Sequence, residues 1–136
     1  MPRGERTARH RVLIIDDEES TRLLLARYLS KDLKVEAQLA CTCEQALRFA
    51  GDYAYDAILL DLLMPGIGGL EVLKEIRRAS PNTSTPVVII SVASDQESIG
   101  RALAEGASAY HVKPVRRAEI VATVQQQLAA RKKSAR

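Results

Sequence analysis

Polar side chains with complementary chemistry directly follow four short apolar segments of the sequence. They are three carboxylates, one hydroxyl and one ammonium: Asp16, Asp17, Asp61, Ser91 and Lys113. Three carboxylates held close together would repel one another and raise one another's pKa values, and one lysine offsets only one of these charges. A divalent cation would resolve the conflict. A few hard oxygen ligands favour Mg²⁺ that keeps several of its waters over Ca²⁺ in a full protein cage.

The same groups could also handle a phosphoryl group. A carboxylate, a Mg²⁺, a lysine and a hydroxyl are the parts of a phosphoryl-transfer site. A carboxylate can itself accept the phosphoryl group and become an aspartyl phosphate. This chemistry requires that side chains far apart in the sequence meet in space, so the elements that carry them must be identified next.

The apolar segments before these residues have the pattern of buried parallel strands. Residues 12–15, 57–60 and 87–90 are rich in branched side chains and do not alternate with polar residues. That pattern is typical of strands covered on both faces of a parallel sheet. Residues 109–112 are a fourth candidate. Residues 34–39 alternate polar and apolar side chains, as an edge strand does.

Helical patterns lie between the predicted strands. Capping boxes at Thr42–Gln45 and Ser94–Glu97 predict two helix starts, and Gly106 predicts a helix end. Each stripe of apolar residues has spacings of three or four, so each helix offers one apolar face. The stripes are Leu24, Leu25, Tyr28 and Leu29; Cys43, Ala46, Leu47 and Ala50; Val72, Leu73 and Ile76; Ile99, Ala102 and Leu103; and Ile120, Val121, Val124 and Leu128.

Strand and helix thus alternate five times, which predicts an α/β fold. It is a doubly wound, five-stranded parallel sheet with helices on both faces. Right-handed crossovers leave few topologies, and we expect the flavodoxin-like strand order 2-1-3-4-5. This order places the alternating strand at an edge. It also puts the ligand site at the carboxyl ends of the first and third strands, which the three aspartates follow.

Length and composition indicate one globular domain. The chain has 136 residues, of which 46% are hydrophobic and 27% charged, so a disordered, collagen-like or disulfide-stapled chain is excluded. No apolar run approaches the roughly 18 residues that cross a bilayer. The Arg-rich start lacks the apolar stretch of a secretory signal. We therefore predict a cytoplasmic protein with no membrane partner.

The net charge of +3 is concentrated at the ends of the chain. Residues 1–11 carry +3, from four arginines and one glutamate, and residues 131–136 carry +4, so residues 12–130 carry −4. We predict one folded domain over residues 10–130 with basic tails at 1–9 and 131–136. Basic tails could contact phosphates, but solvated tails are the favoured interpretation. With one Phe and no Trp, we expect no direct nucleic-acid binding.

The two cysteines, Cys41 and Cys43, are too few for a tetrahedral zinc site, and we predict that both are small reduced core residues. His111 is predicted to be a surface residue of an edge strand with no pairing partner.

Over about residues 10–130 the sequence resembles the receiver domains of two-component response regulators, of the single-receiver chemotaxis type. The resemblance rests on five features in one order, each at the end of a predicted strand. They are the Asp16–Asp17 pair, Asp61-Leu-Leu-Met-Pro with Gly69 following, Ser91, Tyr110 and Lys113–Pro114. Taken one at a time, these residues also have structural explanations: helix capping for the aspartate pair, a turn for Asp61, a strand end for Lys113–Pro114 and core packing for Tyr110.

The resemblance implies a role for each acidic residue and the lysine. Asp61 is the expected phosphoacceptor. Asp16, Asp17, Asp61 and the backbone carbonyl of Leu63 are the expected ligands of Mg²⁺, for which Mn²⁺ could substitute. Lys113 is expected to pair with a phosphoryl oxygen.

The resemblance also implies a switch. The hydroxyl of Ser91 is expected to bond the phosphoryl group, Tyr110 to turn inward, and the Lys113–Pro114 peptide bond to be cis. The surface of the fourth helix, fifth strand and fifth helix then changes for a downstream partner. The expected phosphodonor is a sensor histidine kinase or a phosphotransfer protein. The chain would catalyse only its own phosphorylation and is not predicted to be an enzyme.

Two residues depart from the family pattern. Val92 stands where the family usually has a small residue, and its branched side chain could crowd the phosphoryl site. Gly68 replaces a common acidic residue, which predicts a loose start of the third helix. We expect a complete single-domain receiver, monomeric or a weak homodimer, rather than one excised from a longer protein.

Three alternatives were weighed. A receiver-like interaction module that does not switch is the closest competitor, and Ser91, Val92 and Gly68 are its only support. A haloacid-dehalogenase-type phosphatase would have Asp-x-Asp after the first strand and a cap domain, whereas this chain has Asp16-Asp17-Glu18. A dinucleotide site is excluded because no Gly-x-Gly-x-x-Gly follows that strand.

Overall fold

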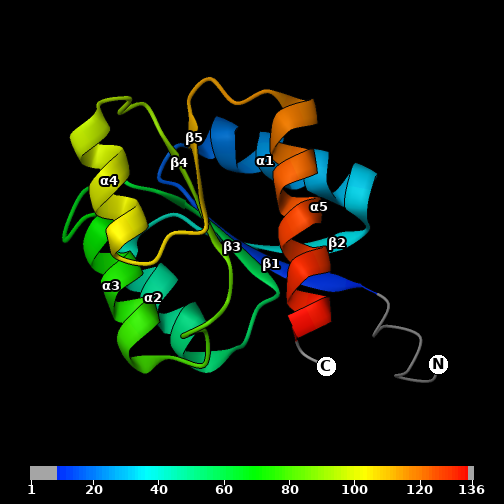
Figure 1. Ribbon diagram of the computed structural model, residues 1–136, viewed down its shortest axis with the longest axis horizontal. Coiled ribbons are helices and arrows are strands. Elements are labelled where there is room, and N and C mark those ends of the chain that lie inside the picture. Colours follow the sequence, from blue (N-terminus) through cyan, green and yellow to red (C-terminus); the bar gives the residue numbers. More distant parts are fainter. Residues whose placement is uncertain (1–8, 135–136) are drawn as a thin grey trace.

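The computed structural model describes residues 9–134, and five parallel strands form its central sheet in the order β2-β1-β3-β4-β5 (Figure 1). In chain order the elements are β1 (His10–Ile15), α1 (Glu19–Leu33), β2 (Val35–Ala40), α2 (Cys43–Asp52), β3 (Ala57–Asp61), α3 (Gly69–Ala79), β4 (Val87–Ser91), α4 (Gln96–Ala104), β5 (Ala109–Val112) and α5 (Arg117–Ser134). The predicted fold class and strand order are confirmed.

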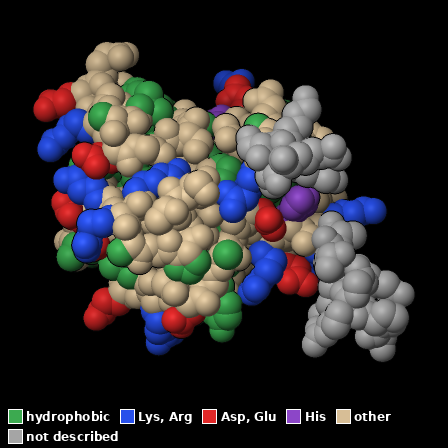
Figure 2. Space-filling view, turned by 60° about the horizontal axis from the view of Figure 1, so that its bottom comes forward, with side chains coloured by type: hydrophobic (Ala, Val, Ile, Leu, Met, Phe, Trp, Pro, Cys, Tyr) green, Lys and Arg blue, Asp and Glu red, His purple; other side chains and the backbone are tan. Residues whose placement is uncertain are grey.

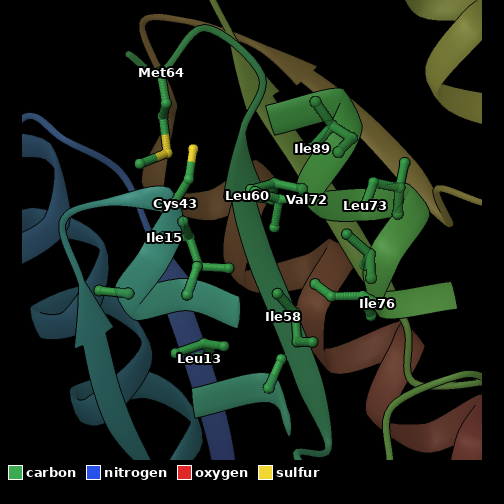
Figure 3. Packing of buried hydrophobic residues seen from close by; sticks show 14 of the residues in the cluster. Leu13, Ile15, Cys43, Ile58, Leu60, Met64, Val72, Leu73, Ile76 and Ile89 are labelled. Atoms are coloured by element: carbon green, nitrogen blue, oxygen red, sulfur yellow. The ribbon is translucent and has the colours of Figure 1, made fainter. Parts of the chain in front are cut away.

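Helices cover both faces of the sheet and create two separate cores. In β1, successive side chains point to opposite faces, so Leu13 and Ile15 join one core while Val12 and Ile14 join the other. The first core packs against α2, α3 and the buried side of α4, and the second against α1 and α5. Figure 3 shows part of the first core, where strand residues meet α3, Cys43 and Met64. The non-alternating apolar runs reflect this coverage of both faces.

The parallel register brings the carboxyl ends of the central strands to one edge. Ile15 is paired with Leu60 across β1 and β3, and Asp61 is paired with Ile90 across β3 and β4. All five residues of β3 and of β4 are buried. The polar residues that end these strands therefore lie next to one another, at a position fixed by the buried runs before them.

The predicted helix caps are partly correct. Thr42 accepts a hydrogen bond from the Gln45 backbone N–H at 3.0 Å, and Gly106 ends α4 with φ at +103°. The Ser94–Glu97 prediction is wrong by one residue: Asp95 is the N-cap of α4, and its carboxylate accepts from the Ser98 backbone N–H at 3.0 Å. A carboxylate is favoured there because it also carries charge at the positive end of the helix.

Two further predictions need correction. His111 is not without a partner, because its Nε2 lies 2.8 Å from the Thr123 hydroxyl on α5. Burial lowers the pKa of His111, although the charge of Glu119 opposes this. Both cysteines are free thiols, but only Cys43 is buried and Cys41 is partly exposed.

The C-terminal helix extends beyond the expected domain boundary. α5 continues to Ser134, into the range assigned to a basic tail. The N-terminal tail prediction concerns residues 1–9, of which 1–8 lie outside the described residues, as do residues 135–136. On the face shown in Figure 2, Lys and Arg side chains are interspersed with Asp and Glu side chains. Arg78 and Glu75 form one such ion pair, on α3.

The start of α3 packs directly on the end of β3, and Gly69 makes this approach feasible. The Gly69 N–H donates to the Leu62 carbonyl at 2.9 Å. A Cβ atom at Gly69 would lie 2.3 Å from the Asp61 carbonyl oxygen and 2.5 Å from the Leu62 Cα. Because both neighbours are backbone atoms, no side-chain rotation could relieve the contact. The preceding Gly68 has φ at +89°, a conformation that favours glycine.

We therefore expect Gly69→Ala to lower the free energy of unfolding by about 1–3 kcal/mol, as overpacking does. Gly100→Ala is the matched control, since a Cβ there has no atom within 4 Å and lies within α4. The control should raise stability by roughly 0.5–1 kcal/mol because alanine favours the helix. Urea denaturation measures both. Equal effects of the two substitutions would contradict the close approach at Gly69.

Candidate functional site

Four of the five sheet strands deliver the predicted polar residues to one site. Asp16 follows β1, Asp61 ends β3, Ser91 ends β4 and Lys113 follows β5. Carboxylate oxygens of Asp16, Asp17 and Asp61 all lie within 4.8 Å of one another. The structure thus brings together the three carboxylates and the ammonium that the sequence singled out.

Asp16 is the most buried member of the cluster, with 1% of its surface exposed. Its Oδ1 accepts from the Glu18 backbone N–H at 2.9 Å, and its Oδ2 accepts from the Lys113 ammonium at 3.0 Å. Its carbonyl oxygen accepts from Arg22 on α1 at 2.8 Å. These bonds fix the loop after β1, in which Asp17 remains exposed.

Helix capping does not explain the aspartate pair. The N-cap of α1 is Glu18, and Asp16 uses its carboxylate in the turn before the helix rather than at the cap. The capping alternative that the sequence left open is therefore not supported.

Asp61 is held between a backbone donor and the lysine. Its Oδ1 accepts from the Leu63 backbone N–H at 3.1 Å, and its Oδ2 lies 3.3 Å from the Lys113 ammonium. Burial raises the pKa of Asp61, and the nearby Asp16 charge raises it further, whereas the Leu63 and Lys113 contacts oppose the shift. The net effect of the protein groups around Asp61 is therefore to raise its pKa above the ordinary value of an aspartate.

Lys113 contacts both buried carboxylates, those of Asp16 and Asp61. Burial alone would lower the pKa of Lys113, but hydrogen bonds and charge interactions with Asp16 and Asp61 outweigh it and raise the pKa. The Lys113–Pro114 peptide bond is cis. Lys113 is thus a fixed positive charge, and it balances one of the three aspartates.

The remaining negative charge fits a hard divalent cation. Three carboxylates and few other oxygen donors fit Mg²⁺, which in proteins usually keeps several of its waters and binds few protein ligands. The role of the Leu63 backbone carbonyl as a further metal ligand stays a prediction. The Leu63 N–H, a separate group, donates to Asp61.

Ser91 and Tyr110 are linked to each other through Ala93 rather than directly to the acidic cluster. Ser91 is buried, and its hydroxyl accepts from the Ala93 backbone N–H at 3.1 Å. The Tyr110 hydroxyl donates to the Ala93 carbonyl at 2.7 Å. Tyr110 is partly buried against the first core. One residue of the β4–α4 loop therefore connects the hydroxyl beside the site to the aromatic ring on β5.

An open pocket of about 350 Å³ lies over Asp61. Its lining residues are Asp17, Glu18, Asp61, Leu63, Val92 and Lys113. Leu63 and Val92 are 56% and 61% exposed, so apolar side chains form part of the mouth. Sequence analysis did not assign a role to Glu18, because an acidic residue beside a helix start is ordinarily explained by the helix dipole.

Comparison with known proteins identifies this arrangement. The family model described as the response regulator receiver domain matches residues 12–125. Response regulator ArlR of Staphylococcus saprophyticus is 35% identical over 121 residues, covering 87% of this chain and 52% of that protein. Transcriptional regulatory protein MalR of Bacillus subtilis is 38% identical over 104 residues, covering 76% and 43%. The chain spans about half or less of the length of these relatives.

Solved structures give the same result. Chemotaxis protein CheY4 of Vibrio cholerae superposes with a TM-score of 0.81 at 29% identity, covering 88% of this chain and 98% of that one. The receiver domain of sensor histidine kinase PA1611 of Pseudomonas aeruginosa superposes with a TM-score of 0.81 at 26% identity, covering 90% and 99%. That structure is described as having a magnesium ion coordinated in its active site cleft.

The raised pKa of Asp61 predicts a stability effect with a definite sign. A carboxyl whose pKa is raised on folding stabilises the fold at low pH and loses that contribution as pH rises through the folded pKa. Asp61→Asn should therefore raise the free energy of unfolding at pH 7 in a chelator. The gain should disappear in acid, below the ordinary Asp range of about 4.

Urea denaturation at several pH values measures this effect. Asp52→Asn, at the exposed end of α2, controls for the change in net charge. Saturating Mg²⁺ should stabilise the unsubstituted protein more than Asp61→Asn, since a ligand bound to the folded state adds stability. A less stable Asp61→Asn protein at pH 7 in chelator would contradict the electrostatic account.

Proposed function

The chain belongs to the family of response regulator receiver domains, and from this premise we propose that Asp61 is its phosphoacceptor. Receiver domains of this family act in two-component signalling as switches rather than as enzymes. One observation supports the assignment most strongly: the Lys113 ammonium lies within 3.3 Å of Asp61 and 3.0 Å of Asp16, beside a three-carboxylate cluster. The phosphodonor is a phosphohistidine of a histidine kinase or phosphotransfer protein.

In the proposed reaction an Asp61 carboxylate oxygen attacks phosphorus and the phosphorus–nitrogen bond of the donor breaks. The imidazole leaves with the bonding electron pair. Lys113 offsets charge on the transferred oxygens, as an ammonium does in other phosphoryl-transfer sites. Asp16, Asp17 and Asp61 would hold Mg²⁺, or Mn²⁺ in its place, which supplies charge neutralisation at the phosphoryl oxygens. The chain would thus catalyse its own phosphorylation and no other reaction.

The proposed switch begins at Ser91. A phosphoryl group adds roughly −1.5 to −2 charges and three strong acceptors, so the Ser91 hydroxyl gains a charge-assisted bond if it turns toward Asp61. That hydroxyl now accepts from Ala93, whose carbonyl accepts from Tyr110. Movement of Ser91 would therefore disturb the loop that holds Tyr110, and with it the α4–β5–α5 face proposed to meet a downstream partner.

Other properties of the whole protein remain proposals. Among residues 9–134, no helix has the length and hydropathy needed to span a bilayer. The cytoplasmic location, the monomeric or weakly dimeric state and the solvated role of the basic ends stay predictions.

The first test is an intact-mass spectrum after incubation with acetyl phosphate. We expect the mass of one phosphoryl group on the unsubstituted protein with Mg²⁺, and none with chelator or in Asp61→Asn. If no gain occurs and the phosphoryl mimic beryllofluoride also leaves the Tyr110 resonances unmoved, the chain is an interaction module that does not switch.

Val92 predicts a steric effect at the same pocket. Because its exposed branched side chain lines the mouth over Asp61, Val92→Ala should accelerate phosphorylation by acetyl phosphate several-fold. Ile67→Ala is the matched control, since Ile67 is similarly exposed but is not among the residues that line the pocket. Rates of phosphorylation and dephosphorylation that match those of the unsubstituted protein would show that Val92 does not restrict access.

A further inference from the structure

Glu18 is a fourth carboxylate at the pocket, separate from the three-aspartate cluster. It lines the pocket together with Asp61 and Lys113. Its Oε1 lies 3.8 Å from the Lys113 ammonium, and the hydroxyl of Thr21 donates to the same oxygen at 2.6 Å. The backbone N–H of Glu18 donates to the Asp16 carboxylate at 2.9 Å. Backbone and side chain are therefore both held in place beside the lysine.

Helix capping by a hydrogen bond does not account for this placement, and the helix dipole alone does not direct the carboxylate toward Lys113. Glu18 is the N-cap of α1, yet within residues 9–134 its side chain makes no capping hydrogen bond. Its side chain is 62% exposed, so it fills no core. The Thr21 hydroxyl instead holds the carboxylate at the mouth of the pocket.

Glu18 changes the net charge of the proposed phosphorylation site. The charges of Asp16, Asp17 and Asp61 would be offset by one divalent cation and by Lys113. Glu18 then leaves one net negative charge where a phosphodonor must enter. Its carboxylate, 3.8 Å from the Lys113 ammonium, also offsets part of the positive charge that would attract incoming phosphoryl oxygens.

We propose that Glu18 is a specificity-determining residue that disfavours small, free, highly charged phosphodonors. A donor presented by a docked protein has interface contacts that offset the repulsion, whereas a free dianion has none. The effect would favour protein donors over free small donors by slowing the reaction with the latter. This inference rests on the proposed function of Asp61.

The test compares two small donors of different charge. Acetyl phosphate is a dianion at neutral pH, and phosphoramidate carries one net negative charge less. Glu18→Gln removes the charge and keeps an oxygen that can accept from Thr21. At saturating Mg²⁺, titrated for each variant, we expect it to accelerate phosphorylation by acetyl phosphate roughly three- to tenfold, the size of one unit-charge interaction several ångströms away near a surface.

Acceleration with phosphoramidate should be smaller, and both effects should shrink as added salt screens the charge. Glu19→Gln is the matched control: it makes the same change in net charge at the next residue, which is exposed in the first turn of α1 and is not among the pocket-lining residues. We expect its rates to equal those of the unsubstituted protein.

Several results would overturn the inference. They are a rate for Glu18→Gln equal to or below that of the unsubstituted protein, equal acceleration with both donors that does not respond to salt, or the same acceleration in Glu19→Gln. Failure of the proposed function has a different signature, because then neither donor would modify Asp61 in any of the proteins. Phosphorylation of Asp61 with unchanged donor preference in Glu18→Gln would refute only the role of Glu18.

Discussion

The site depends on one interaction, in which the ammonium of Lys113 is held between the carboxylates of Asp16 and Asp61. These residues come from the ends of β5, β1 and β3, so they meet only if the strands are parallel and in the observed order. Burying a charged group without a partner is costly, so each of these three groups depends on the others for its place in the interior. The apolar runs before each residue supply the compensating burial, and the contact is therefore a consequence of the whole sheet.

Much of this arrangement could be predicted from the sequence because it follows from patterns with few solutions. Runs such as 57–60, apolar at every position, must be covered on both faces, and that requirement leads to the parallel sheet with its polar residues at one edge. Details decided by single local contacts could not be predicted in this way. Asp95 takes the cap of α4 in place of Ser94, and His111 reaches Thr123 across to α5.

Glu18 illustrates a different limit on prediction. Its position beside a helix start has an ordinary electrostatic explanation, and only the contacts with Thr21 and Lys113 suggest the role proposed for its carboxylate at the pocket. The roles of Ser91 and Tyr110 in a switch stay predictions. Their connection through the backbone of Ala93 depends on the conformation of the β4–α4 loop, for which the sequence has no periodic signal.

The burial and charge that destabilise ionised Asp61 also make the site sensitive to added positive charge. Burial and the Asp16 charge raise the pKa of Asp61, so further positive charge placed beside its carboxylate would favour its ionised form. Under the proposed switch, a cation or phosphoryl group at the site can shift the population between two states by no more than the difference in its interaction free energy with them. The link from Ser91 through Ala93 to Tyr110 is short and uses two hydrogen bonds. If a phosphoryl group on Asp61 draws the Ser91 hydroxyl toward it, as proposed, the bond from the Ala93 N–H must break, and the carbonyl of that same residue holds Tyr110.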